Sequence, residues 1–146
     1  MAIEADLTDI AHVIQLAVAP VFLLTGVGTI INALNARLTR IIDRRRVLEE
    51  RMEAPDKARA TAVRNELHLL ARRLRLVYAA ILLAVTSALL VCLLVASAFV
   101  GAFVAIDLGR AIAILFVMAM LALIASLGFF LREIFLAVVA GYHPVK

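Results

Sequence analysis

The chain has 146 residues, of which 65% are hydrophobic, and a mean hydropathy of +1.06. Soluble domains contain only about 45 to 50% apolar residues, so this composition excludes an ordinary soluble domain and predicts a membrane protein. The formal net charge is +4, but 12 of the 15 basic residues and six of the 11 acidic residues lie between Arg37 and Arg75. That window alone is strongly basic.

The first predicted elements are an extracytoplasmic N-terminal segment, residues 1–9, and a transmembrane helix, residues 10–34. A helix rises about 1.5 Å per residue and the hydrocarbon core is about 30 Å thick, so about 20 residues suffice for one crossing. The sequence FLLTGVGTIINALNARLTRIIDRRRVLEE, residues 22–50, passes from apolar to charged with no Gly or Pro after Gly28. It predicts one continuous helix that leaves the membrane and carries its arginines into the cytosol.

Four polar residues of this first span fall within an arc of about 100° on a helical projection. They are Gln15, Thr25, Thr29 and Asn32. In one interpretation they bond their own backbone or a neighbouring helix, each contact contributing about 0.6 to 2 kcal/mol. In the alternative, this face lines the water-filled pore of an oligomeric ion channel. The first interpretation is favoured, because uncharged polar residues commonly join helices in membranes.

A cytoplasmic antiparallel helical hairpin, residues 35–75, is predicted between the first and second spans. On and just beyond its returning arm, apolar residues recur at spacings of four and three, as in a coiled coil; they are Val63, Leu67, Leu70, Leu74 and Val77. A looser stripe on the outgoing arm consists of Leu38, Ile41, Ile42, Leu48 and Met52. Residues 53–56, with the sequence EAPD, are the predicted turn, because Pro and an acidic residue suit the start of a helix.

The arginines nearest the membrane are candidate contacts for anionic lipid headgroups, at about 1 kcal/mol each. They are Arg37, Arg40, Arg72, Arg73 and Arg75. The simpler interpretation is a solvated helix face that the topology requires in any case. We expect no nucleic-acid partner, because the basic window has no aromatic residues for base stacking and is interleaved with glutamates.

The second transmembrane helix is predicted over residues 76–101, followed by an extracytoplasmic loop, residues 102–109. Small residues recur every four positions along this helix and form a candidate helix-packing ridge; they are Ala80, Ala84, Ala88, Cys92 and Ala96. Such a ridge lets another helix approach closely, either within the chain or in a second subunit. Because three short spans have little interior of their own, self-association is expected.

The third transmembrane helix is predicted over residues 110–131, with Arg110 and Arg132 at its two ends, about 33 Å apart along a helix. Residues 132–146 form the predicted cytoplasmic tail. Within it, residues 134–140 are apolar and either prolong the third helix or lie along the membrane interface. No carboxylate lies within the three predicted spans, which disfavours proton-coupled transport through an internal acid.

The predicted orientation follows from the excess of Lys and Arg in cytoplasmic loops. The segment between the first two spans holds 12 of them, whereas the segment before the first span has none and the next loop has only Arg110. The N-terminus is therefore expected outside, and the hairpin and the C-terminal tail inside.

The sequence contains no recognisable catalytic, cofactor-binding or metal-binding motif. His12, His68 and His143 lie in three different regions and no pair has the spacing of metal ligands. We therefore expect no enzymatic activity, no cofactor and no metal.

Three blocks of the sequence resemble the bacterial membrane family catalogued as domain of unknown function 2721. They are IQLAVAPVFLLTGVGTIINALNARLTRIIDRRRVLEE, RRLRLVYAAILLAVTSALLVCLLVA and MLALIASLGFFLREI, with APVFLLTGVG and R-x-x-R-I-I-D-R the more specific parts. The resemblance covers nearly the whole chain and implies a small protein of the bacterial cytoplasmic (inner) membrane with three spans. It implies no catalytic residue, substrate or cofactor, because the family is uncharacterised.

Together these observations predict an all-α integral membrane protein with three transmembrane helices and a cytoplasmic coiled-coil hairpin between the first and second. The expected role is that of a homo-oligomeric structural or accessory subunit, with the lipid bilayer and a larger membrane complex as partners. The alternative is an oligomeric ion channel whose first span lines the pore.

Overall fold

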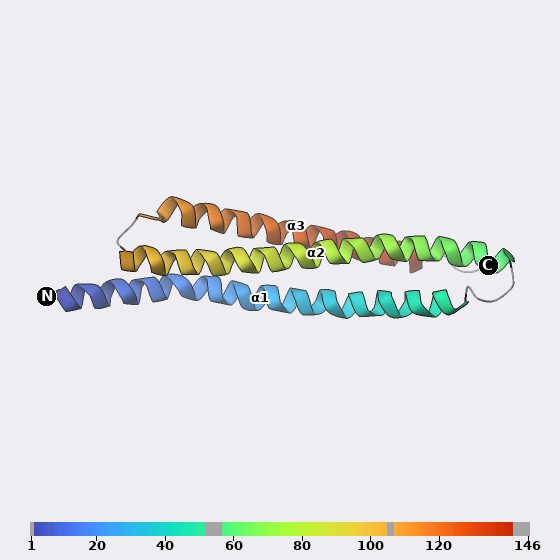
Figure 1. Cartoon of the computed structure of the whole chain (residues 1–146), viewed down its shortest axis with the longest axis horizontal. Coiled ribbons are helices and arrows are strands. Elements are labelled where there is room, and N and C mark those ends of the chain that lie inside the picture. The colour runs from blue at the N-terminus through green and yellow to red at the C-terminus, as the bar shows by residue number, and fades with distance from the viewer. Residues whose placement is uncertain (1, 52–56, 105–106, 142–146) are drawn as a thin grey trace. The chain divides into compact units, whose positions relative to one another are not determined.

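The computed structural model of the chain describes residues 2–51, 57–104 and 107–141. They form three α-helices: α1 (Ala2–Arg51), α2 (Lys57–Val104) and α3 (Gly109–Gly141) (Figure 1). No strand occurs among these residues. Each helix contains a stretch long and apolar enough to cross a membrane, namely Val18–Glu50, Thr61–Val104 and Gly109–Val139. The prediction of an all-helical chain with three membrane-length helices is confirmed.

Helix α1 runs without interruption through the junction between apolar and charged sequence, as predicted. Nothing in this stretch removes a backbone hydrogen bond after Pro20, so the intrahelical bonds can continue from the apolar half into the arginine-rich half. Helix α2 is equally continuous and carries the charged and apolar halves in the opposite order. The predicted turn at residues 53–56, together with Met52 and His143, lies outside the described residues.

Two helix ends differ from the limits that the sequence suggested. Helix α2 continues past Gly101 to Val104, because a single glycine costs a helix interior only about 1 kcal/mol. Helix α3 includes residues 134–140, so this apolar segment prolongs the third helix. At the start of α3, the Asp107 carboxylate accepts a 3.0 Å hydrogen bond from the backbone N–H of Gly109, which satisfies one of the free donors of the first turn.

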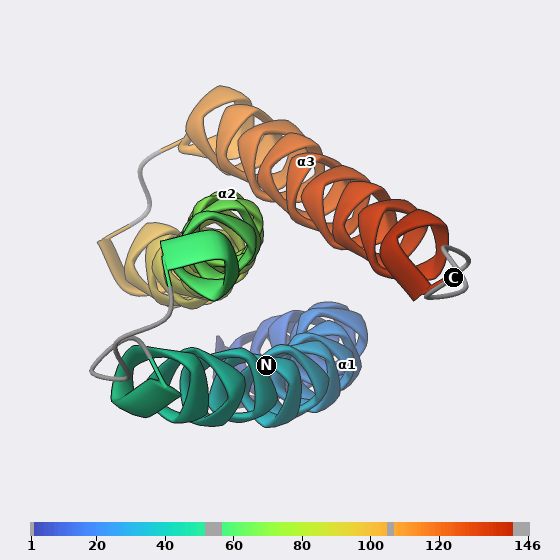
Figure 2. The ribbon, with the colours of Figure 1, turned by 90° about the vertical axis from the view of Figure 1, so that its right-hand side faces the viewer.

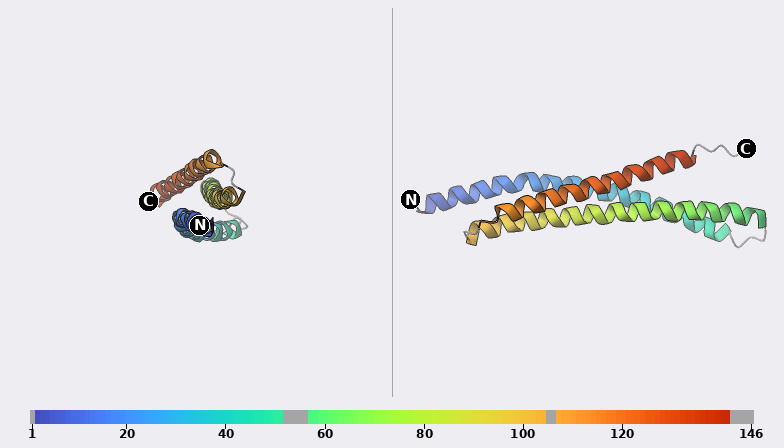
Figure 3. Two further views of the ribbon diagram at one scale, coloured as in Figure 1. Left: turned by 90° about the vertical axis from the view of Figure 1, so that its left-hand side faces the viewer. Right: turned by 90° about the horizontal axis from the view of Figure 1, so that it is seen from above.

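The chain divides into two compact units, and each unit contains one segment from each of the three helices. Unit 1 consists of Met1–Ile30 and Leu83–Ile124, and unit 2 of Ile31–Leu82 and Ala125–Lys146. In unit 1, the yellow part of α2 and the orange part of α3 are antiparallel neighbours (Figure 3). The Ser87 hydroxyl joins them by donating a 2.8 Å hydrogen bond to the carbonyl oxygen of Ala119, and both residues are fully buried.

Unit 2 contains the teal part of α1, the green part of α2 and the red part of α3, which lie around a common centre (Figure 2). Its apolar core is formed by Leu34, Ile41, Leu48, Leu70, Val77 and Ala80. The Ser126 hydroxyl donates a 2.7 Å hydrogen bond to the carbonyl oxygen of Ala80, so α2 and α3 approach closely here as well.

Buried residues recur every seven positions on each helix. On α1 they are Val27, Leu34, Ile41 and Leu48; on α2 they are Leu70, Val77, Ala84 and Val91, with Ala80, Ser87 and Leu94 as a second series; on α3 they are Ala119, Ser126 and Glu133. A seven-residue repeat keeps one side of each helix turned toward its neighbours. Of the predicted hairpin stripe, Leu38, Val63, Leu67 and Leu74 are half-buried and Ile42 is exposed.

Candidate functional site

Among the described residues, Glu133 is the one charged residue that is buried, with 1% of its surface exposed. It lies on α3 within unit 2, seven residues after the buried Ser126. An ionised carboxylate is costly to remove from water unless it is paired and hydrogen-bonded. Its position therefore requires partners from the neighbouring helices.

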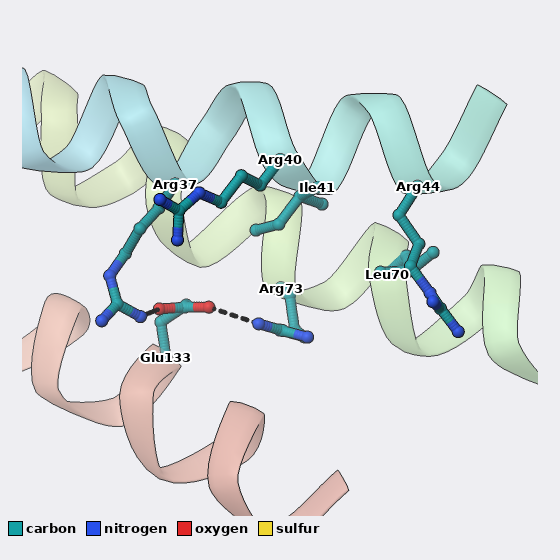
Figure 4. Close-up of a pocket in the computed structure, with 7 residues that line it drawn as sticks. All are labelled: Arg37, Arg40, Ile41, Arg44, Leu70, Arg73 and Glu133. Carbon is teal, nitrogen blue, oxygen red and sulfur yellow. Dashed lines mark hydrogen bonds and ion pairs between the residues drawn. The ribbon is translucent and has the colours of Figure 1, made fainter. Parts of the chain in front are cut away.

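Two arginines supply those partners, one from each of the other helices (Figure 4). Arg37 of α1 donates from Nη1 to Oε2 of Glu133, and Arg73 of α2 donates from Nη2 to Oε1, each at 2.8 Å. The guanidinium carbon of Arg37 also lies 5.1 Å from the centre of the Phe130 ring, within the range of a cation–π contact. Glu133 therefore joins α1, α2 and α3 within unit 2.

This three-residue cluster, which we call the Arg–Glu–Arg clamp, carries a net positive charge because two cations face one anion. The side chain of Arg37 is 37% exposed and that of Arg73 is 23% exposed, so the carboxylate is enclosed while the guanidiniums retain contact with solvent. Nε of Arg73 is buried and has no hydrogen-bond partner among the described residues. The clamp thus holds one unused donor.

An open pocket of about 290 Å³ lies against the clamp, and we call it the arginine pocket. Besides the clamp residues, it is lined by Arg40 and Arg44 and by the buried side chains of Ile41 and Leu70. Arg44 is paired with Glu66 on α2, because its Nε and Nη2 atoms lie 3.1 and 2.6 Å from Oε1. Four arginine side chains therefore line one small space (Figure 4).

The seven-residue repeat places the clamp residues together. Arg37 follows the buried Leu34 by three positions, and Arg73 follows the buried Leu70 by three positions. In a coiled-coil repeat the position three residues after a buried one faces the partner helix as well. Glu133 stands at the buried position itself, where it continues the series of Ala119 and Ser126. The helices therefore direct these three charged side chains toward one another.

Sequence reasoning did not select Glu133, because it ended the third span at Leu131. The membrane-length stretch of α3 extends from Gly109 to Val139 and contains Glu133, so it is longer than the span that was predicted to end at Leu131. The sequence signal that could have identified Glu133 is its position on one helix face with Ala119 and Ser126, at intervals of seven residues.

The five arginines predicted to contact lipid headgroups have different surroundings. Arg37 and Arg73 belong to the clamp, and Arg40 is exposed at the arginine pocket. Arg72 and Arg75 are exposed on α2. Their contact with lipid stays a prediction.

The predicted polar stripe of α1 is exposed throughout, at Gln15, Thr25, Thr29 and Asn32. The two threonine hydroxyls donate to backbone carbonyl oxygens one turn earlier, Thr25 to Val21 at 3.3 Å and Thr29 to Thr25 at 3.1 Å. These hydroxyls are therefore satisfied within α1. Within the part of the chain that the structure describes, no other helix covers the stripe, which leaves both interpretations open.

The predicted packing ridge of α2 divides into a buried part and an exposed part. Ala80 and Ala84 are fully buried, Ala88 is half-buried, and Cys92 and Ala96 are exposed. The first part thus packs within the chain, and the last part is free for contacts outside it.

Replacing Ala84 with leucine is expected to destabilise the fold by about 1 to 3 kcal/mol, because the larger side chain overpacks a filled position. The matched control is Ala102→Leu, at an exposed position of the same helix, which should cost little. Thermal unfolding in mild detergent, followed by circular dichroism, measures both. Equal melting temperatures for the two variants would contradict the packing of Ala84.

The described residues contain no group of three or more potential metal ligands, and His12 and His68 are exposed on different helices. The arrangement at Glu133 is suited to joining helices and to attracting anions.

No solved structure and no protein of curated function shows significant similarity to the chain. A family model described as "Protein of unknown function (DUF2721)" matches residues 17–141, which include Arg37, Arg73 and Glu133. The resemblance found in the sequence is confirmed, and the chain belongs to the DUF2721 family.

Proposed function

We propose that this chain is a non-enzymatic, homo-oligomeric structural or accessory subunit of the bacterial inner membrane. The observation that carries this proposal is the use of its buried polar side chains. The buried polar residues among those described are Ser87, Ser126 and Glu133. Each forms a hydrogen bond with a helix other than its own. The polar chemistry of the chain's interior therefore serves to join helices.

The proposed topology has the N-terminus outside and a cytoplasmic coiled-coil hairpin formed by the charged halves of α1 and α2. The excess of arginine in this region supports the orientation. The buried Ile41 and Leu48 are spaced by seven on the first arm, and the buried Leu70 is spaced by seven from Val77, just beyond the second arm. This spacing supports the coiled coil. The cation of Arg44 and the carboxylate of Glu66 add a contact between the two arms.

The orientation predicts how two engineered cysteines react in a Cys92→Ala background. A cysteine at Ala58 should react with a membrane-impermeant thiol reagent only after the cells are opened, because it lies near the hairpin turn. A cysteine at Ala5 should react in intact cells whose outer membrane has been made permeable. Labelling in the reverse pattern would overturn the orientation.

Self-association is supported by the exposed end of the α2 ridge. Ala96 and Cys92 present small side chains on a helix that otherwise exposes large apolar ones, such as Leu89 and Leu93. Small residues let the backbones of two membrane helices come close, where van der Waals contacts favour association. A second copy of this chain is the proposed occupant, since identical ridges can pack against one another.

Light scattering of the purified protein in mild detergent tests the structural role. We expect one defined oligomer, and a shift to a smaller species in Ala96→Leu, because leucine at this position holds two ridges apart. The shift should occur without loss of helix content. A parent protein that is monomeric would contradict the proposal.

An ion channel lined by α1 is the second candidate, favoured by the exposure of Gln15, Thr25, Thr29 and Asn32. In this case neutral dipoles would line the pore, and its width and field strength would set selectivity. Reconstituted protein would then pass current, and the double variant Thr29→Val with Asn32→Leu would abolish it with the oligomer intact. An oligomer that passes no ions would exclude the channel and favour the structural role.

A further inference from the structure

We infer that the arginine pocket of unit 2 is a binding site for a phosphate group. This goes beyond the structural role, because it assigns a ligand to a defined set of residues. The site consists of Arg37, Arg40, Arg44 and Arg73, and Glu133 also lines it (Figure 4).

The charge of the pocket is not balanced by the ion pairs of the described residues. Four arginines face it, whereas Glu133 neutralises one positive charge and Glu66, through Arg44, a second. Two positive charges remain. A phosphomonoester carries about 1.5 to 2 negative charges and matches this surplus, and a phosphodiester, with one negative charge, neutralises half of it. The guanidinium fork also fits the oxygen geometry of phosphate, to which it can donate two parallel hydrogen bonds.

Two of the arginines that line the pocket also have donors that no described residue uses. Nε of Arg73 is buried without a partner among the described residues, although most buried N–H groups in proteins are hydrogen-bonded. Arg40 forms no ion pair within the described part of the chain and lines the same space. The Arg73 Nε has almost no exposed surface. The exposed Arg40 is therefore the free donor that an anion in the pocket would meet.

The clamp prepares this site before any ligand binds. The carboxylate oxygens of Glu133 lie 2.8 Å from one guanidinium nitrogen of Arg37 and one of Arg73, which restricts both side chains. The Phe130 ring also lies beside the Arg37 guanidinium. Side chains that are already ordered lose less conformational freedom on binding. The pocket volume of about 290 Å³ is just below the range for small-molecule sites, about 300 to 1,000 Å³. It suits a phosphate headgroup better than a larger ligand.

The phosphate could belong to a lipid or be free in solution, and the same oxygens would be recognised in both cases. Two observations connect the pocket with lipid. Leu131 and Phe135, two residues to either side of Glu133, are exposed large apolar side chains. All three helices contribute to the pocket from stretches apolar enough to cross a membrane. The headgroup of an anionic phospholipid at the membrane surface would therefore lie within reach.

The test uses the full-length protein with two probes. Native mass spectrometry counts the lipids retained after release from nanodiscs of phosphatidylcholine and phosphatidylglycerol, and calorimetry in neutral detergent measures binding of inorganic phosphate. The variant is Arg40→Gln, which removes an unpaired cation of the pocket. Its matched control is Arg46→Gln, which removes a cation of the same helix that does not line the pocket.

We expect the parent and Arg46→Gln to prefer phosphatidylglycerol to phosphatidylcholine, and Arg40→Gln to bind about tenfold more weakly, as for the loss of one charge-assisted hydrogen bond. Retention of phosphatidylglycerol without binding of inorganic phosphate would support the lipid as the source. Binding of inorganic phosphate that phosphatidylglycerol does not displace would support the free anion. Equal losses in the two variants, no loss in Arg40→Gln, or a parent that binds neither probe would overturn the site. Unchanged melting temperatures would show that both variants fold.

Discussion

Replacing Glu133 with leucine is expected to destabilise the folded protein by about 3 kcal/mol, because the two clamp arginines then lose their shared anion. Removing one partner of a buried ion pair costs about 3 to 5 kcal/mol, and the lower figure applies since Arg37 and Arg73 keep partial access to solvent. The Phe130 contact would remain but cannot replace a carboxylate. Unfolding by heat or denaturant in mild detergent measures the loss.

The control for this prediction removes the whole clamp. The triple variant Arg37→Met, Arg73→Met and Glu133→Leu leaves no charge of the clamp behind, and apolar side chains of similar length fill the space. Replacement of a complete buried ion cluster is often neutral or stabilising, so this variant should melt near the parent. If Glu133→Leu alone also melts with the parent, the carboxylate is not enclosed by the two arginines.

The helices of this fold could be predicted from the sequence because their causes are local. Long apolar stretches identify membrane-length helices, and the lack of a break after Gly28 is enough to predict that α1 continues into its charged half. The apolar positions Leu48, Leu70 and Val77 could also be selected as core, because a repeat of apolar residues marks the side of a helix that is buried.

The clamp could not be predicted in the same way, because its causes are distant in the chain. Glu133 is 96 residues from Arg37 and 60 from Arg73, so no local window contains an ion pair. A glutamate beside Arg132 at the end of an apolar stretch is typical of a membrane boundary, and its burial depends on how three helices pack. Hydropathy alone therefore assigned Glu133 to the tail.

The arginine window shows the same limit of local reasoning. Arg37, Arg40 and Arg44 look alike in sequence, since each is a basic residue on the same helix. In the structure Arg37 pairs with Glu133 of α3 and Arg44 pairs with Glu66 of α2. Arg40 has no ion-pair partner among the described residues and lines the pocket. The partners on the other helices decide which role each arginine has.

The core of the predicted hairpin leads to the second large effect, at Leu48. This side chain is 5% exposed, whereas its neighbour Val47 is 48% exposed. Leu48→Ala should destabilise the protein by about 2 to 5 kcal/mol through the lost apolar burial and the cavity that remains. Alanine is preferable to aspartate here, because an aspartate one turn from Arg44 would find a partner and conceal the cost.

Val47→Ala is the matched control, since it removes a similar apolar group from an exposed position of the same turn and should change stability by no more than about 0.5 kcal/mol. The comparison also tests the surroundings of the hairpin. In water, the loss of Leu48 includes the hydrophobic transfer term, whereas between helices in lipid only the packing term remains. Urea unfolding of the two variants, followed by circular dichroism, gives both free energies. A cost for Leu48→Ala as small as that for Val47→Ala would contradict a packed hairpin core in contact with the cytosol.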